Sequence, residues 1–191
     1  LITTFMSGIV NDSDNVYLGG YPGPLRELAG VWVEEIDALA PEQTNKITFA
    51  DGTSSTCSLL CDLIHLEGAQ CVASYESNFY AGMPAITKNQ YGKGYTYYIG
   101  TNPTEDGIVK VLDMAVQTAG VNSVVAEATG LEITCRKADR FTYYFIFNFK
   151  DKVLPLPESF IGQKDLLTGE IIPEGCHLKQ YDAYLVAFPN E

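Results

Sequence analysis

Most of this chain has the hydrophobic pattern of β-strands. Between residues 46 and 101, branched and aromatic side chains form short runs divided by glycines, and Asp51-Gly52 is a typical hairpin turn. The chain also opens on a strand-like run, residues 1–6. We expect further strands at Ile47–Phe49, Cys57–Leu66, Cys71–Tyr75, Ala85–Thr87 and Gly94–Ile99.

Residues 104–119 have the clearest helical period. Two acids, Glu105 and Asp106, stand where the helix dipole is positive, and Gly120 provides a stop. A helix that follows strands indicates an α/β layer. The expected apolar face of this helix consists of Ile108, Val111, Leu112, Ala115 and Ala119.

The segment from Pro24 to Leu39 allows two interpretations. Pro24 suits the first position of a helix and Gly30 suits the left-handed residue after its end, which predicts a short helix at residues 24–29 and an extended run at 31–37. Apolar residues up to Leu39 also fit one longer helix. We favour the short helix.

The pattern changes after residue 121. Residues 131–136 and 141–149 alternate strictly and predict a β-hairpin. Further strands are expected around Leu166-Leu167 and from Leu178 to Phe188. We therefore expect an α/β domain over residues 1–127 and a small all-β antiparallel domain over 128–191, joined at 126–130.

Charge and composition exclude several classes of protein. The net charge is −12, yet 46% of the residues are hydrophobic, so the chain is a globular protein and not a disordered acidic tail. An acid excess opposes binding to nucleic acid and to anionic lipid. No apolar run approaches the ~20 residues that span a bilayer, so we expect a soluble protein.

The cysteines give no sign of a disulfide framework. There are five, an odd number, and none forms a CxxC pair. This usage suits reduced thiols in a cytosol. Cys57 and Cys61 lack a second pair of ligands at zinc spacing, so we assign no metal and no cofactor.

The candidate catalytic groups do not form an active site. Glu34 and Glu35 are adjacent, and neighbouring side chains diverge on both strands and helices, so the two cannot flank one glycosidic bond. Cys61 and His65 lack a nucleophile elbow, which leaves a thiol-dependent amidase as a minor alternative. The single GxG, Gly92-Lys93-Gly94, lacks the third glycine of a dinucleotide loop and predicts a tight turn.

The second half of the predicted hairpin is unusually aromatic. Five rings, at positions 141, 143, 145, 147 and 149, share one face and are expected to pack in a core. Tyr144 would then point outward, and it is our candidate for stacking on a sugar ring.

Several long blocks resemble one known family. Residues 3–11, 19–39, 79–85, 89–94 and 97–101 strongly resemble the trimerisation domain of family 42 glycoside hydrolases, the bacterial β-galactosidases. Residues 165–169 are similar to the small C-terminal β domain of that family. The resemblance implies a subunit with a catalytic TIM barrel, a middle domain of flavodoxin or class I glutamine-amidotransferase type with three layers, and a C-terminal β domain.

By this resemblance the chain lacks the barrel and begins partway through the middle domain. No catalytic residue is assigned, the chain alone is expected to be inactive, and a galactoside would bind only through the missing barrel. The resemblance implies the noncatalytic C-terminal region of a bacterial, cytoplasmic β-galactosidase that assembles as a homotrimer. The alternative is a free-standing carbohydrate-binding or scaffold protein. The candidate interface residues are Tyr21, Pro22, Arg26, Trp32, Glu34 and Glu35.

Overall fold

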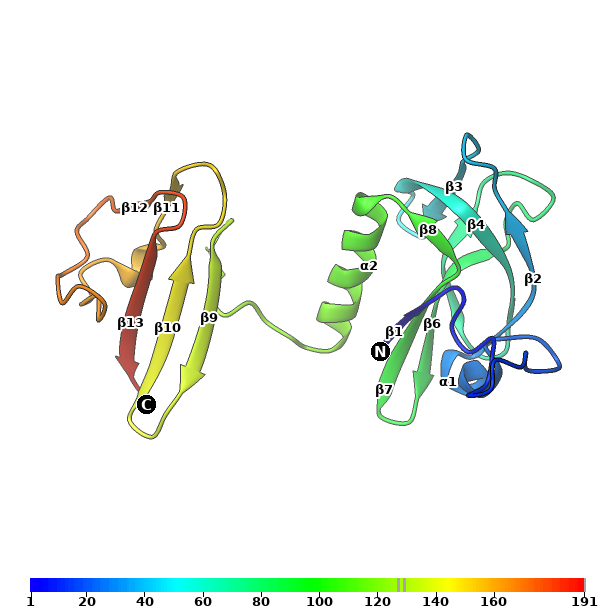
Figure 1. Ribbon diagram of the computed structural model, residues 1–191, viewed down its shortest axis with the longest axis horizontal. Helices are drawn as coiled ribbons and strands as arrows, with labels where there is room; N and C mark the ends of the chain where they lie inside the picture. Colours follow the sequence, from blue (N-terminus) through cyan, green and yellow to red (C-terminus); the bar gives the residue numbers. More distant parts are fainter. Residues whose placement is uncertain (127, 129, 191) are drawn as a thin grey trace. The chain divides into compact units, whose positions relative to one another are not determined.

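The computed structural model describes residues 1–126, 128 and 130–190. The chain divides into two compact units, Leu1–Val121 and Asn122–Glu191 (Figure 1). This division falls slightly before the boundary that we expected between residues 127 and 128. Positions 127 and 129 of the expected joint lie outside the described residues.

The first unit contains an eight-stranded sheet. Its order is β1-β7-β6-β5-β3-β4-β2, and β8 pairs with β4. Among the described strands only β1 and β7 pair in parallel, and the other pairs are antiparallel. The mixed α/β class is confirmed. These pairings do not confirm a flavodoxin-like sheet, whose strands are mostly parallel. The strands are β1 (Ile2–Thr4), β2 (Val31–Ala38), β3 (Asn45–Phe49), β4 (Ser54–Leu66), β5 (Gln70–Tyr75), β6 (Pro84–Tyr91), β7 (Gly94–Ile99) and β8 (Thr101–Pro103).

Two predicted turns set the register of this sheet. Asp51-Gly52 joins β3 to β4, and the Asp51 carboxylate accepts the backbone N–H of Thr53 at 3.0 Å. Gly92 and the next residue join β6 to β7 in a tight hairpin, which confirms that the GxG run is a turn. All the predicted strands of this region are present, and most are longer than predicted.

The short helix is confirmed. The 3-10 turn η1 (Gly23–Leu25) leads into α1 (Arg26–Ala29), which ends where Gly30 adopts a left-handed φ of 64°. The longer helix is wrong, because β2 begins at the next residue and pairs with β4.

The second helix, α2 (Glu105–Thr118), covers the sheet near β4 (Figure 1). Thr104, the first residue of the predicted helical segment, is its N-cap residue. The helix approaches β4 so closely that a Cβ on Gly107 would lie only 2.5 Å from the Oγ of Ser55. Among the described residues no helix, α2 included, is long and apolar enough to cross a membrane.

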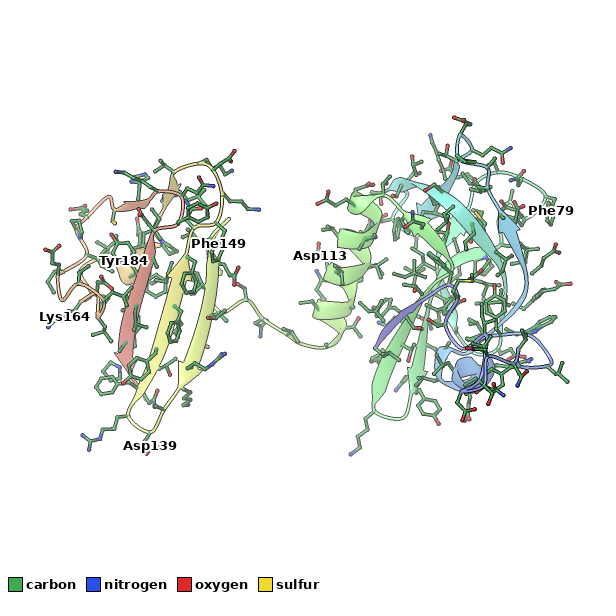
Figure 2. All side chains as sticks on the ribbon, in the orientation of Figure 1. Phe79, Asp113, Asp139, Phe149, Lys164 and Tyr184 are labelled. Carbon is green, nitrogen blue, oxygen red and sulfur yellow. The ribbon has the colours of Figure 1, made fainter. Side chains whose placement is uncertain are left out.

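The inner face of α2 differs in part from the prediction. Gly107 and Val111 are buried, whereas Ile108 and Leu112, which we expected on the same face, are exposed. Gly107 and Val111 are four residues apart and share the inner face, and Ile108 and Leu112 each lie one residue further around the helix. Figure 2 shows Asp113 on the side of α2 that points away from the sheet.

The second unit is all-β, as predicted. The hairpin β9 (Glu132–Lys137) and β10 (Phe141–Phe147) pairs with β13 (Ala183–Pro189) in an antiparallel sheet. A small ladder joins β11 (Leu154–Pro155) to β12 (His177–Leu178). The 3-10 turn η2 (Glu158–Phe160) closes the core.

One predicted strand and one predicted boundary in this unit are wrong. Leu166-Leu167 is a turn, because the buried Asp165 carboxylate accepts the backbone N–H groups of Leu167 and Thr168. The last long strand begins at Ala183 and not near residue 178, where the chain forms the short β12 instead.

Candidate functional site

The structure separates the six candidate interface residues into three groups. Arg26 on α1 and Trp32 and Glu34 on β2 meet at one exposed surface. Tyr21 and Pro22 lie beneath it, and Pro22 is buried. Glu35 is exposed at the β-bulge of β2.

Five side chains form one stacked array, which we call the Arg26–Trp32 surface. The Arg26 guanidinium lies 5.7 Å from the Trp32 ring centre, and its Nε and Nη2 groups donate hydrogen bonds of 2.6 and 2.5 Å to the Glu67 carboxylate. The Trp32 ring stacks on His65 at 4.7 Å, and His65 Nε2 donates to Glu34 at 2.7 Å. Such arrays hold aromatic and Arg side chains in fixed positions.

Strand pairing and the end of α1 build this surface. Trp32 on β2 lies directly opposite His65 on β4. After β4 the chain folds back, and the carbonyl oxygen of Gly30 accepts the backbone N–H groups of Glu67 and Ala69. That contact places Glu67 beside Arg26. The guanidinium lowers the pKa of Glu67, so the pair is fully charged near neutrality.

The Trp32 indole fits against a glycine turn. Its Nε1 is buried without a hydrogen-bond partner among the described residues, and a Cβ on Gly20 would lie 1.9 Å from that atom. Gly19 has a similar φ, 92° against 86°, but a Cβ on Gly19 would have no neighbour within 4 Å. The two glycines therefore form a matched pair for substitution.

We expect Gly20→Ala to push the indole away from this turn, since a Cβ at that position cannot coexist with it. Gly19→Ala has nearly the same backbone strain without the clash. The emission maximum of Trp32, the single tryptophan, reports the difference. A red shift in Gly20→Ala alone is expected, and equal spectra for the two variants would contradict the fit.

A buried carboxylate anchors the turn beneath the surface. Asp62 on β4 is fully buried and accepts hydrogen bonds from the hydroxyl groups of Tyr21 and Tyr98, each at 2.7 Å. The backbone N–H of Val33 donates to the Tyr21 carbonyl at 2.8 Å. Tyr21 therefore holds the turn in place through internal hydrogen bonds. Its side chain is not part of the Arg26–Trp32 surface, although neighbouring residues are.

Burial raises the pKa of Asp62 to about 6, although the two tyrosine hydrogen bonds oppose the rise. The folded state therefore binds this proton more tightly than the unfolded chain does. The resulting stabilisation is full below the unfolded pKa of about 4 and is lost as the pH rises through about 6. The difference between the two pKa values corresponds to about 3 kcal/mol.

We expect Asp62→Asn to remove this pH dependence. Between about pH 4.5 and about pH 7.5, the free energy of unfolding of the wild type should fall by about 2 kcal/mol relative to that of the variant. Urea titrations followed by Trp32 fluorescence measure it in the first unit. Parallel pH profiles for the two proteins would show that Asp62 titrates normally.

Among the described residues, this surface does not bring the candidate catalytic groups together. Glu34 binds His65, and Glu35 has a separate position on the bulge. Cys61 is buried and lies 3.8 Å from the Thr101 hydroxyl, so the structure does not bring it together with His65 as an amidase dyad. All five cysteines are described, and all are free. Within the described residues, no group of three or more His, Cys, Asp or Glu side chains could hold a metal ion.

The orientation predicted for Tyr144 is wrong. Its ring packs inward at 5.6 Å from Phe160 and 5.5 Å from Phe188, because η2 covers that side of the sheet. The predicted core row is the outer one instead, and Phe149 at its end is exposed (Figure 2). Phe147 and Phe149 stack on each other, with ring centres 5.6 Å apart.

Sequence reasoning missed His65, Glu67 and Asp62 as parts of the site. All three come from β4 and the turn after it, far from α1 and β2 in sequence. Only the register of β2 against β4 reveals them, and a single sequence does not specify that register.

The chain is similar to known proteins of one family. Residues 1–122 match the model of the β-galactosidase trimerisation domain. The chain is 48% identical to β-galactosidase LacA of Lactobacillus acidophilus over 88% of its length, and 41% identical to BgaP of Planococcus sp. (strain L4) over 97%. It spans about a quarter of those relatives, 25% and 28% of their lengths.

The fold agrees with a solved relative. The crystal structure of β-galactosidase from Bacillus circulans sp. alkalophilus matches with a TM-score of 0.86 at 34% identity, over 97% of this chain and 28% of that one. The matched family region contains the whole Arg26–Trp32 surface. The chain belongs to the family of β-galactosidase trimerisation domains.

Proposed function

We propose that this chain is the noncatalytic C-terminal region of a β-galactosidase and that it supports assembly of a homotrimer. The observation that carries the proposal is the exposed, pre-ordered Arg26–Trp32 surface inside the matched trimerisation domain. Aromatic and Arg side chains concentrate binding energy at protein interfaces. Galactoside hydrolysis would then belong to other parts of the whole enzyme.

Sedimentation equilibrium of the purified chain tests the assembly role. A species of three times 20.9 kDa is expected. An assay with a chromogenic β-galactoside tests the noncatalytic role, and no turnover is expected. A monomer at all concentrations would refute assembly by this chain, and hydrolysis would refute the noncatalytic assignment.

We also propose that the first unit belongs to a flavodoxin-like, three-layer domain of a cytoplasmic enzyme. The parallel pairing of β1 with β7 supports the fold, and the free thiols support the compartment. A structure of a longer form of the protein, with further parallel strands beside β1, is the expected result. A longer form in which β1 remains the edge strand would contradict it.

A further inference from the structure

A hairpin next to the Arg26–Trp32 surface exposes apolar side chains that no other described residue covers. Leu18 is 99% exposed and Val16 is 65% exposed. Met6 and Val10 are also exposed. We call residues 6–18 the apolar hairpin. Single exposed apolar residues are ordinary, but four on one short hairpin are a concentration of apolar surface that favours a protein contact.

The apolar hairpin is ordered by its own hydrogen bonds. Val10 and Val16 form an antiparallel bridge, and the backbone N–H of Tyr17 donates to the Ile9 carbonyl at 2.9 Å. At the tip, the side-chain oxygen of Asn11 accepts backbone N–H groups at 2.9 and 3.0 Å. The apolar side chains are therefore presented on a pre-ordered support, which lowers the entropy cost of binding.

The base of the hairpin is tied to the turn that Tyr21 anchors. A Cβ on Gly8 would lie 2.6 Å from the carbonyl oxygen of Pro22, and one on Gly23 would lie 2.7 Å from the Tyr17 ring. The Arg26 guanidinium also donates to the Gly19 carbonyl at 3.1 Å. The apolar hairpin is thus continuous with the Arg26–Trp32 surface.

We propose that the apolar hairpin is an anchor that seats Leu18 and Val16 on a second copy of this chain. The inference rests on the proposed function, and it deepens that function by naming the segment that crosses between copies. In a closed ring of three, each contact joins two different patches, so the apolar hairpin of one copy would meet a different surface on the next.

Photo-crosslinking tests the partner directly. The chain is prepared with p-benzoylphenylalanine in place of Leu18 and irradiated at a concentration where the wild type is assembled. We expect covalent dimers and trimers on a denaturing gel. An assembled protein that yields only uncrosslinked chains would overturn the proposal, because Leu18 would then lie outside every contact between copies.

A charge substitution gives the second test. Leu18→Asp should weaken association at least about tenfold, measured by sedimentation equilibrium. Leu59→Asp is the matched control, since Leu59 is a leucine of the same unit, is 56% exposed, and has a positive φ that suits aspartate. Circular dichroism verifies that both variants fold.

The outcomes separate this inference from the proposed function. Loss of the trimer in Leu18→Asp alone supports the anchor. A trimer that persists in Leu18→Asp overturns the anchor and leaves the assembly role intact. Equal loss in both variants shows a general effect of charge and also overturns it. A wild type that never associates refutes the proposed function itself.

Discussion

Gly30→Ala is expected to lower the free energy of unfolding of the first unit by about 3 kcal/mol. Gly30 has a φ of 64°, which costs an alanine about 1 kcal/mol or slightly more. Its Cβ would also lie 2.5 Å from the side chain of Asn89. Asn89 donates to the carbonyl oxygens of Glu27 and Leu28 at 3.2 and 3.0 Å, and displacing it leaves these groups unpaired, which costs about 2 kcal/mol more.

Gly120→Ala provides the matched control. Gly120 has the same φ of 64°, but nothing lies within 4 Å of the position of its Cβ. The control should therefore show only the backbone cost, about 1 kcal/mol. Chemical denaturation followed by Trp32 fluorescence measures both variants. Equal destabilisation would show that the packing of Asn89 against Gly30 contributes nothing.

Trp32→Ala is expected to cause the largest loss of assembly. The indole is the centre of the Arg26–Trp32 surface, where it contacts both the Arg26 guanidinium and the His65 ring. Removing such an anchor weakens a contact between copies by about 2 kcal/mol, or about 30-fold. Sedimentation equilibrium measures the association constant, and the folded state is verified by circular dichroism.

Tyr95→Ala is a chemically matched control. Tyr95 is also an exposed aromatic residue with a cation over its ring, since Lys88 Nζ lies 4.4 Å from the ring centre. It lies on β7, outside the Arg26–Trp32 surface. We expect Tyr95→Ala to assemble as the wild type does. A similar loss in both variants would mean that Trp32 has no special role.

The parts of the fold that local rules determine were predictable from the sequence. Gly30 ends α1 because its left-handed conformation satisfies the backbone hydrogen bonds of the last helical turn. This effect depends on a single residue. The Asp51-Gly52 turn is local in the same way. The period and the acids of helix α2 predict its two ends to within one residue.

The site depended on long-range pairing that no local rule supplies. Tyr21 and Asp62 are 41 positions apart, as are Arg26 and Glu67. The candidates Arg26, Trp32 and Glu34 came from a family resemblance, whereas their partner His65 follows only from the alignment of β2 with β4. For this reason the sequence indicated only part of the stacked array.

The outer face of β10 shows how a strict alternation can mislead. Both faces of that strand have aromatic residues, and the pattern favours the richer face as the inner one. The structure buries the side with Tyr144 and Ile146, because η2 brings Phe160 over it. A shift of one residue exchanges the inner and outer faces of a strand and so reverses the direction of every side chain on it. Here the segment that covers the sheet determines which face is buried.

The single tryptophan allows the most direct test of the central claim, that copies of this chain meet at the Arg26–Trp32 surface. Acrylamide quenching of Trp32 fluorescence is measured across the concentrations over which the chain associates. We predict that quenching falls as the trimer forms, because the partner covers the exposed edge of the indole. Quenching that stays constant while the chain associates, or a chain that never associates, would contradict the account.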